Sequence, residues 1–550
     1  MLDLQKMTDY EETRRTFKYE VPEFYNFGFD VIEKRAAEND KVAFYYVTRD
    51  GETIESHTFS DLDRSSNRVG NMLRGLGVVK GDRAIVVLPR IPAFYEVVIG
   101  TIKMGVISMP GTMLLTAKDL EYRINRAKAK LVIVTEEHAG RIEEIKDQCP
   151  TLEHCIIVGG QREGWIDYTA ARADALDTLS RDDVEPSRAE DDMLIYFTSG
   201  TTAYPKMVPR DHAYPLAHKI TGTYWMDLEE NDIHWTLSDT GWAKAAWGMF
   251  PQWQLGAAIV LYDAGPGFDA DAHLHVIEQL GVTTFCAPPT VFRLFAQIDL
   301  SKYDLGSLRH TLGAGEPLNP EAMRAWRIAT GHNPHDGYGQ TESVNLVSNF
   351  PSVPIRPGSM GKAVPGFDIQ IVNDDGNVVA EHEVGHIAVR MGDEWPPGLF
   401  KGYYDDDAAN AESFRNGFYY TGDTGMRDED DYIWFVGRSD DLILSASYRI
   451  SPFEVESALA EHPAVVESAV IGKDDSVRGQ IVKAYVVLAE GQEPSNELTT
   501  EIQEFVKSNT APYKYPREIA YLDALPKTIS GKIRRVELRE KAHEEAQAAE

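Results

Sequence analysis

The chain has 550 residues, of which 87 are Asp or Glu and 55 are Lys or Arg, so its formal net charge is −32. At roughly 100–200 residues per domain this length predicts two to four domains, and a hydrophobic content of 43% excludes wholesale disorder. So acidic a chain is a poor match for a nucleic-acid backbone, whereas a local basic pocket for a small anion remains compatible with the charge.

Cysteine usage and the lack of long apolar runs bear on the compartment. Cys149, Cys155 and Cys286 do not make a disulfide framework in so long a chain, and none belongs to a set with zinc-ligand spacing. No apolar run reaches the ~18–20 residues of a membrane span, and the N-terminal segment lacks the apolar core of a signal peptide. We therefore expect a soluble cytoplasmic protein that does not insert into membranes.

Apolar runs that favour strands alternate with helix-like segments over much of the chain. The runs 83–88 (RAIVVL) and 130–135 (KLVIVT) lie on either side of the helix-like segment 94–103. Residues 257–261 (AAIVL) are followed by a second helix-like segment, 272–280. Strand, crossover helix and strand in sequence predict parallel sheets with helices on their faces.

The pattern changes in the last third of the chain. Residues 367–372, the turn 374–377 (DDGN) and residues 386–390 are typical of an antiparallel hairpin. The polar stretch 437–441 (GRSDD) is the predicted domain boundary, and the residues that follow it suffice for a small α+β domain.

Two familiar motifs lack the context that their chemistry needs. Residues 382–386 (HEVGH) match the zinc-protease pattern, which requires both histidines on one helix face. Gly385 and the flanking strand-like runs predict a hairpin instead. Gly313 and Gly315 resemble half of a dinucleotide fingerprint, but Leu318 stands where the third glycine belongs, so a Rossmann site is not expected.

A hydroxyl-rich loop follows the apolar run 194–196. The segment 198–206 (TSGTTAYPK) contains four hydroxyl side chains, a glycine and a lysine. Hydroxyls and loop N–H groups hold phosphate oxygens, and the lysine adds a point charge. By itself the segment is equally compatible with a loop that binds nothing.

The order of motifs along the chain resembles that of one enzyme family. The loop matches the adenylate-forming signature TSGTTGxPK at every fixed position except Ala203. Further motifs of that family follow in its order: GEP at 315–317, DGYGQTE at 336–342, YTGD at 420–423, GRSDD at 437–441 and PKTISGK at 526–532. Residues 24–27 (FYNF), 238–242 (SDTGW) and 511–517 (APYKYPR) are similar to the medium-chain subgroup. The chain is thus identified as resembling the AMP-forming acyl-CoA synthetases.

The resemblance implies an α/β fold and a set of nucleotide contacts. It implies a large N-terminal domain (1–439) of mixed and parallel sheets flanked by helices, with a small β-barrel-like part, and a small mobile α+β domain (440–550) that rotates at Asp440. The implied nucleotide contacts are Thr198, Ser199, Gly200, Thr201, Thr202, Lys206, Gly315, Glu316, Pro317, Asp336, Gly337, Tyr338, Gly339, Gln340, Asp423, Arg438 and Arg449.

Catalysis and CoA binding are implied in the same way. Thr341 would hold the α-phosphate, Glu342 would bind Mg²⁺, and Lys532 would bridge the carboxylate and phosphate oxygens. The implied CoA contacts are Ala446, Ser447, Tyr448, Arg478, Lys507, Tyr515, Pro516 and Arg517. Ser447 stands where the family has a glycine beside the pantetheine tunnel, which puts the second half-reaction in more doubt than the first.

The acyl pocket is expected between Trp242 and Gly339. Acetate-specific members of the family have a tryptophan where this chain has Gly339, which predicts roughly an indole's volume of open space. We expect an acid larger than acetate, either medium-chain, branched, alicyclic or aromatic.

The predicted activity is an ATP-dependent ligation of such an acid to coenzyme A through an acyl-adenylate, with release of AMP and pyrophosphate. ATP, CoA and Mg²⁺ are the expected cofactors, and fatty acid metabolism is the expected context. Two alternatives stay open, an adenylation enzyme that loads a carrier-protein thiol and a nucleotide-binding protein without turnover. The sequence also leaves open whether the chain forms a homo-oligomer.

Overall fold

The computed structural model describes residues 4–198, 205–265, 267–316, 318, 320–439, 441–445, 448–475, 478–511, 513–527 and 533–547. Its internal contacts divide the chain into two compact units, Met1–Phe367 with Met391–Glu412 and Asp368–Arg390 with Ser413–Glu550. The sequence-based boundary instead keeps residues 1–439 together, and its pivot, Asp440, lies outside the described residues. That boundary remains a prediction.

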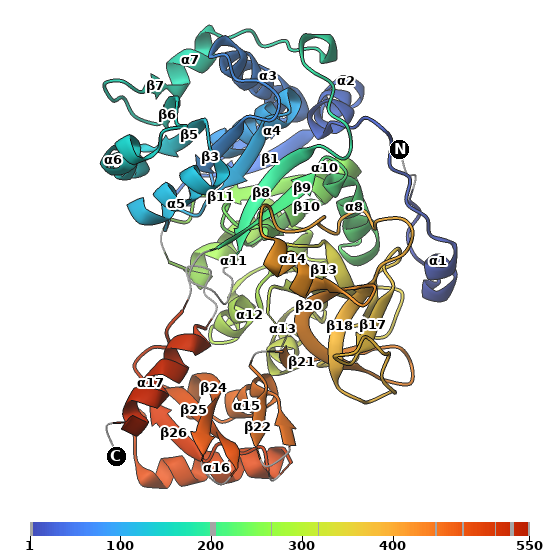
Figure 1. The fold of residues 1–550 in the computed structure, drawn as a ribbon, viewed down its shortest axis with the longest axis vertical. Helices are drawn as coiled ribbons and strands as arrows, with labels where there is room; N and C mark the ends of the chain where they lie inside the picture. Colours follow the sequence, from blue (N-terminus) through green and yellow to red (C-terminus); the bar gives the residue numbers. More distant parts are fainter. Residues whose placement is uncertain are drawn as a thin grey trace. The chain divides into compact units, whose positions relative to one another are not determined.

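One sheet of the first unit carries the hairpin that leads into the hydroxyl-rich loop (Figure 1). Its strands, in spatial order, are β7 (Ile166–Asp167), β6 (His154–Val158), β5 (Leu131–Thr135), β3 (Arg83–Val87), β4 (Ile107–Pro110), β8 (Asp192–Thr198) and β9 (Lys206–Asp211). Neighbours are parallel except β8 and β9, which are antiparallel. The predicted parallel strands are confirmed.

The second sheet of this unit carries the other predicted nucleotide segments. Its strands, in order, are β16 (Lys362–Ala363), β15 (Asn345–Ser348), β14 (His335–Gly339), β13 (His310–Ala314), β12 (Thr284–Ala287), β10 (Ile233–Thr236), β11 (Ala258–Tyr262), β1 (Val42–Val47) and β2 (Ile54–Thr58). Strands β14 to β1 are parallel in their pairings, and the strands at both ends are antiparallel.

Helices supply the layers against which these sheets are buried. Those of the first unit are α1 (Tyr10–Thr16), α2 (Lys34–Glu38), α3 (Phe59–Gly75), α4 (Pro92–Met104), α5 (Ala117–Ala127), α6 (Glu136–Ile145), α7 (Tyr168–Asp174), α8 (Tyr214–Ile220), α9 (Lys244–Trp247), α10 (Phe250–Leu255), α11 (Ala270–Leu280), α12 (Pro289–Phe295) and α13 (Pro320–Thr330). Local sequence sets their ends: Thr116 and Asp119 form a capping box at the start of α5, and Gly105 ends α4 in a left-handed conformation.

The second unit contains two further sheets. The expected barrel-like part is an antiparallel sheet. Its strands are β17 (Ile369–Val372), β18 (Gly385–Arg390), β20 (Phe418–Arg427), β19 (Phe414–Arg415) and β21 (Ile433–Arg438). The last sheet has β23 (Tyr448–Ile450), β22 (Ile443–Ser445), β25 (Gly479–Leu488), β24 (Val465–Asp475) and β26 (Glu518–Tyr521). Its helices are α15 (Pro452–Ala460), α16 (Asn496–Asn509) and α17 (Arg535–Gln547), whereas α14 (Asp407–Ser413) ends where this unit resumes.

The HEVGH segment forms no helical metal site. His382 has a positive φ and lies before β18, whereas His386 lies within that strand. Each imidazole faces a different carboxylate, His382 that of Glu429 and His386 that of Asp374. The hairpin expected from the sequence is therefore the correct interpretation.

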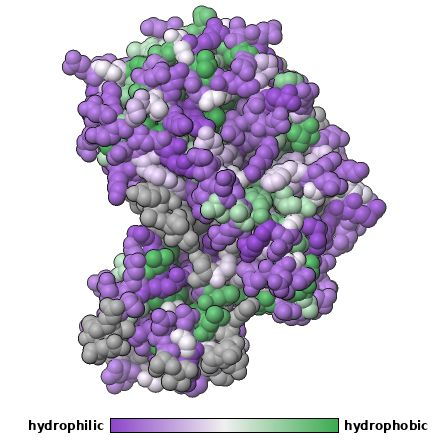
Figure 2. All heavy atoms as spheres, viewed as in Figure 1, coloured by the Kyte–Doolittle hydropathy of each residue, from purple (hydrophilic) through white to green (hydrophobic). Residues whose placement is uncertain are grey.

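The surface drawn in Figure 2 is mostly hydrophilic, as the charge of the chain leads one to expect. Among the described residues, none of the helices combines the length and the apolar character that crossing a bilayer would require.

Candidate active site

The two ends of the hydroxyl-rich loop face each other. Thr198 ends β8 and Lys206 begins β9, and the register of this hairpin pairs the two residues directly. The first and last residues of the segment are therefore neighbours on adjacent strands. The predicted phosphate contacts Ser199, Gly200, Thr201 and Thr202 lie outside the described residues.

Two of the predicted nucleotide-binding segments follow neighbouring parallel strands. Gly315 and Glu316 come directly after β13, and 340–342 form a turn after β14, which pairs with β13. Ligands of open α/β sheets bind beyond the carboxyl ends of the strands, which is where both segments lie. Glu316 accepts a hydrogen bond of 3.0 Å from Thr290, and Pro317 is outside the described residues.

The turn after β14 is connected to the β8–β9 hairpin by a residue that the sequence analysis missed. The Tyr403 hydroxyl donates a hydrogen bond of 2.9 Å to Glu342 Oε1. The Lys206 ammonium lies over the same ring, 4.7 Å from its centroid. The structure therefore brings Lys206 and Glu342 together around Tyr403, although nothing in the local sequence separates this tyrosine from ordinary core aromatics.

Arg210 connects β9 to the turn after β14 and to the segment that precedes Tyr403. Its side chain, only 2% exposed, lies on β9. Nη1 donates to the Glu342 carbonyl oxygen at 2.8 Å and Nη2 to that of Gly398 at 2.5 Å. The guanidinium also lies 4.0 Å from the Tyr214 ring centroid, and burial lowers its pKa. Glu342 is thus held through both its main chain and its side chain.

Strand β14 carries four of the predicted nucleotide residues and packs against the ring of Trp225. An ideal Cβ on Gly337 would stand 2.3 Å from the Trp225 ring, so only glycine fits there. The Trp225 indole donates to the Asp336 carbonyl oxygen at 3.1 Å. Burial raises the pKa of Asp336 to about 7, despite hydrogen bonds from the main chain. Tyr338 and Gly339 complete the strand, and Gln340 and Thr341 begin the turn.

Trp247 lies close to Gly339, beside which the sequence predicts open space for the acyl group. A Cβ on Gly339 would lie 2.4 Å from the Val344 carbonyl oxygen and 2.7 Å from the Trp247 ring. The indole of Trp247, on α9, therefore borders Gly339, and the open space expected for the acyl group remains a prediction. The contact comes from a helix distant in sequence, so the motif around Gly339 does not reveal it.

Trp242, the other expected wall residue, lies in a loop on the other sheet's carboxyl edge. Thr240 donates to the Leu88 carbonyl oxygen at 2.6 Å, just beyond β3. A Cβ on Gly241 would stand 2.1 Å from the Thr112 nitrogen, just beyond β4. This close packing fixes the main chain from which Trp242 projects.

Lys244, which the sequence analysis did not single out, is also near the carboxyl edge of the second sheet. Its ammonium donates to the Ala314 carbonyl oxygen at 2.9 Å, directly before Gly315. Burial lowers its pKa, because the ammonium loses hydration. The contact joins α9 to the end of β13.

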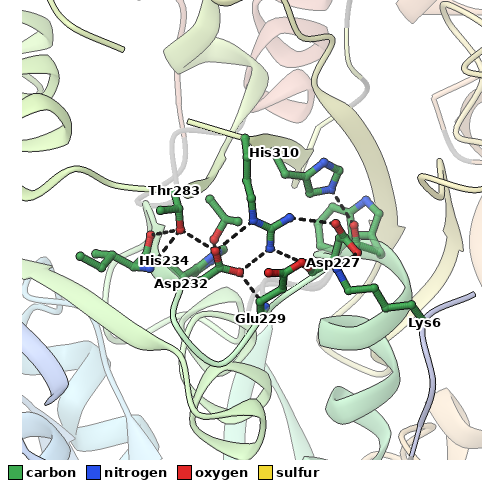
Figure 3. Close-up of polar contacts among 11 residues, drawn as sticks. Lys6, Asp227, Glu229, Asp232, His234, Thr283 and His310 are labelled. Carbon is green, nitrogen blue, oxygen red and sulfur yellow. Dashed lines mark hydrogen bonds and ion pairs between the residues drawn. The ribbon is translucent and has the colours of Figure 1, made fainter. Parts of the chain in front are cut away.

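The opposite edge of this sheet holds a different polar cluster (Figure 3). Arg309, before β13, donates to Asp227 at 2.8 Å and to Asp232, before β10, at 3.0 Å. Thr283 donates to the same Asp232 carboxylate at 2.7 Å, and Lys6 pairs with Asp227 at 3.0 Å. Because it lies at the amino ends of the strands, we interpret this cluster as structural.

In the second unit, the predicted nucleotide contacts Asp423 and Arg438 are neighbours. Asp423 on β20 pairs in register with Arg438 on β21, and their side chains are 3.5 Å apart. Asp423 is buried, and its main-chain N–H donates to the Thr421 hydroxyl at 3.2 Å. Gly422 has a φ of 76°, which glycine adopts readily. The pairing of β20 with β21 thus holds a carboxylate beside an exposed guanidinium.

Three predicted CoA contacts also form one cluster. The Tyr515 ring has the Lys507 ammonium 5.5 Å and the Arg517 guanidinium 5.0 Å from its centroid. Arg517 also donates to the Tyr515 hydroxyl at 3.0 Å, and the neighbouring Pro516 accepts from Gln503. Two cations on one aromatic ring suit a phosphate-bearing ligand.

Other predicted residues of this unit are only partly placed. Arg478 precedes Gly479, which pairs with Ser445 at the edge of the β22–β23 hairpin. Ala446, Ser447, Asp440 and Lys532 lie outside the described residues, as do the side chains of Tyr448 and Arg449.

Comparison with known proteins decides the family. The family model "AMP-binding enzyme" matches residues 32–404, and "AMP-binding enzyme C-terminal domain" matches residues 454–532. The chain belongs to the AMP-binding enzymes. Within them it is 41% identical to the mitochondrial acyl-coenzyme A synthetase ACSM3 of Mus musculus, over 98% of this chain and 94% of the relative. It is 42% identical to the mitochondrial ACSM4 of Homo sapiens, over 97% and 93%.

Solved structures of CoA ligases have the same fold as this chain. The crystal structure of the anthranilate CoA ligase AuaEII in complex with anthranoyl-AMP has a TM-score of 0.88 and 33% identity, over 96% of this chain and 99% of that one. A benzoate CoA ligase from Burkholderia xenovorans LB400 has a TM-score of 0.80 and 26% identity, over 94% and 100%. The predicted fold, medium-chain subgroup and reaction class of this AMP-binding enzyme are confirmed.

The expected cytoplasmic localisation is wrong, because the curated relatives are named as mitochondrial proteins. The expectation came from charge, cysteine content and hydropathy. They carry no information that distinguishes one reducing compartment from another.

Proposed function

We propose that this enzyme joins a carboxylic acid to coenzyme A through an acyl-adenylate, and that Mg²⁺ assists the first half-reaction. The observation that carries the proposal is the meeting of Lys206 and Glu342 at Tyr403. A cation from the phosphate loop and a carboxylate from the turn after β14 thus contact the same tyrosine, and such a pair suits a nucleotide phosphate and its metal.

The first half-reaction depends mainly on positioning the acid against ATP and on stabilising negative charge, and it needs no covalent intermediate with the protein. The acid's carboxylate attacks the α-phosphorus of ATP, the bond to the bridging oxygen breaks, and pyrophosphate leaves with that oxygen. Negative charge develops on phosphate oxygens, so oriented cations and hydroxyls lower the barrier. We propose that Lys206 and Thr341 hold phosphates and that Lys532 bridges the acid and the α-phosphate.

Glu342 fits a magnesium ion that is shared with ATP. Mg²⁺ is usually bound by one or two carboxylates together with substrate phosphates, and less often by a cage of protein ligands. Within the described ranges no cluster of three or more His, Cys, Asp or Glu side chains could hold a metal. When bound, Mg²⁺ would neutralise charge on the phosphates.

The second half-reaction is attack of the CoA thiol on the acyl carbon, with AMP as the leaving group. The cluster of Lys507, Tyr515 and Arg517 supports CoA binding by this chain. We place the domain boundary at Asp440, as the family resemblance implies. Rotation there would exchange the Lys532 loop for residues 444–450 between the two steps.

The acid is proposed to be larger than acetate. Relatives named as anthranilate and benzoate CoA ligases, and the medium-chain subgroup of the curated relatives, support this assignment. The size limit is set by Trp247 as well as by Trp242, because Trp247 contacts Gly339. Fatty acid metabolism is the corresponding context.

A panel of straight-chain, branched, alicyclic and aromatic acids tests the proposal, with AMP release and thioester formation from free CoA as readouts. We expect both with an acid larger than acetate. Acetate as the best substrate by kcat/KM would overturn the assignment of the acid. Acid-dependent ATP–pyrophosphate exchange without a CoA thioester would favour the carrier-protein alternative, and no exchange with any acid would favour a nucleotide-binding protein without turnover.

A further inference from the structure

We propose that Tyr403 is a positioning residue, whose hydroxyl holds the Glu342 carboxylate in the orientation that binds the magnesium ion of MgATP. The inference rests on the proposed function of Glu342 and adds to it a residue that belongs to none of the sequence motifs. Its starting point is the hydrogen bond of 2.9 Å from the Tyr403 hydroxyl to Glu342 Oε1.

The main chain of Tyr403 is fixed independently of any ligand. Its N–H donates to Asn410 Oδ1 at 2.6 Å, and its carbonyl oxygen accepts from Asn410 Nδ2 at 2.9 Å. The preceding Gly402 has a φ of 129°, and a Cβ there would lie 2.9 Å from the same amide. The Tyr403 ring packs edge-on against Phe400, with centroids 4.9 Å apart. The hydroxyl is therefore a donor at a defined position.

The main chain of Glu342 is held to the same segment. Its carbonyl oxygen accepts from the Phe400 N–H at 2.8 Å and from Arg210 Nη1 at 2.8 Å. With the main chain fixed, the side-chain torsions are what remain free in this carboxylate. The Tyr403 hydroxyl restricts them before a ligand arrives, so less conformational entropy is lost on binding.

The ring of Tyr403 has a second effect on charge. Lys206 lies over the ring face, whereas Glu342 lies at the hydroxyl on its edge. The tyrosine therefore separates a cation from an anion that would neutralise each other in a direct ion pair. Both charges stay directed toward the ligand, the lysine toward phosphate and the carboxylate toward the metal.

The test is Tyr403→Phe, which keeps the ring, its packing on Phe400 and its contact with Lys206. Tyr404→Phe is the matched control, because the Tyr404 ring faces Arg83 at 4.5 Å. ATP binding without acid is measured by calorimetry across a Mg²⁺ titration, together with the melting temperature. Mutation of a residue that hydrogen-bonds a metal ligand typically lowers metal affinity 10–100-fold. We expect Tyr403→Phe to raise the half-saturating Mg²⁺ concentration about tenfold, with Tyr404→Phe and metal-free ATP binding unchanged.

A double-mutant cycle with Glu342→Gln separates positioning from a general structural effect. If Tyr403 acts through Glu342, adding Tyr403→Phe to Glu342→Gln causes no further loss of Mg²⁺-dependent binding. An unchanged Mg²⁺ half-saturation in Tyr403→Phe, or an equal loss in both backgrounds, would overturn the inference. Thioester formation by the wild type is assayed separately, so failure of the proposed function is distinguishable from failure of this inference.

Discussion

Asp336 shows how strongly burial alters single side chains in this site. Its carboxyl group is 6% exposed at the start of β14, and loss of hydration raises its pKa to about 7. Trp247 also acts at this scale, because its ring lies against Gly339. Both effects come from neighbours that local sequence does not reveal.

The pH dependence of stability should change in Asp336→Asn. The native pKa of about 7 lies above the ordinary value of 3.8, so the native state binds the proton more tightly than the unfolded state. This contribution is complete below pH 3.8 and is lost as the pH rises through 7. Relative to wild type, Asp336→Asn should gain stability across that window, by at most about 4 kcal/mol. Urea unfolding at several pH values measures the difference, and a pH-independent difference would contradict the assignment.

Trp247→Leu should shift acid preference toward bulkier acids. Removing much of the indole opens space beside Gly339, and the lost packing should cost about 2–3 kcal/mol. Ratios of kcat/KM for matched small and bulky acids measure the shift. Trp326→Leu is the control, because Trp326 is equally buried in the α12–α13 core. An identical acid preference in both variants would show that Trp247 does not border the acyl group.

At the scale of elements, three largely buried histidines lie on β10, β13 and β14. His234 on β10 hydrogen-bonds the Thr284 and Thr236 hydroxyls at 2.8 and 2.7 Å. The rings of His310 and His335 lie 4.4 Å apart on neighbouring strands. Burial lowers the pKa of all three, that of His234 to about 3, so the sheet is built around neutral imidazoles.

This sheet should therefore be sensitive to acid. A histidine with a depressed native pKa contributes stability above pH 6.5 that is lost as the pH falls below that value. Between pH 6.5 and 5, His234 should account for about 2 kcal/mol of lost stability. His234→Gln, which keeps hydrogen-bonding groups but does not titrate there, should show a correspondingly shallower decline in urea unfolding. A decline as steep as that of wild type would mean that His234 is not the titrating group.

At the scale of the whole molecule, the predicted residues are divided between two units. Thr198, Lys206 and Glu342 belong to the first, whereas Asp423 and Arg438 belong to the second. The proposed mechanism requires both sets to act on one nucleotide. The hinge at Asp440 and the catalytic role of Lys532 are the parts of this proposal that rest on family resemblance.

Lys532→Ala tests the division of labour between the two steps. Because Lys532 is proposed to stabilise charge on the α-phosphate, the variant should lose adenylate formation by several orders of magnitude. It should largely retain thioester formation from a supplied acyl-adenylate, since that step does not use the lysine. Pyrophosphate exchange and thioester assays measure the two steps, and equal loss in both would contradict the proposal.

Much of the architecture could be predicted from sequence because it depends on local patterns. Apolar runs at 83–88 and 130–135 became the parallel strands β3 and β5, and the 367–390 region became an antiparallel hairpin. The contact of Trp247 with Gly339 was not predicted, and the cytoplasmic localisation was wrong. The first depends on a helix remote in sequence, and the second on information that composition does not carry.

The order of motifs by itself determined the family, the reaction class and most candidate nucleotide contacts, because each motif is a short run of residues with its own chemistry. Only the tertiary structure identified Tyr403, Arg210 and Trp247 as parts of the site. Tyr403 is 61 residues from Glu342, and Arg210 is 132 residues from it. Such contacts arise from the pairing of strands and the packing of helices over long sequence separations, which no local pattern encodes.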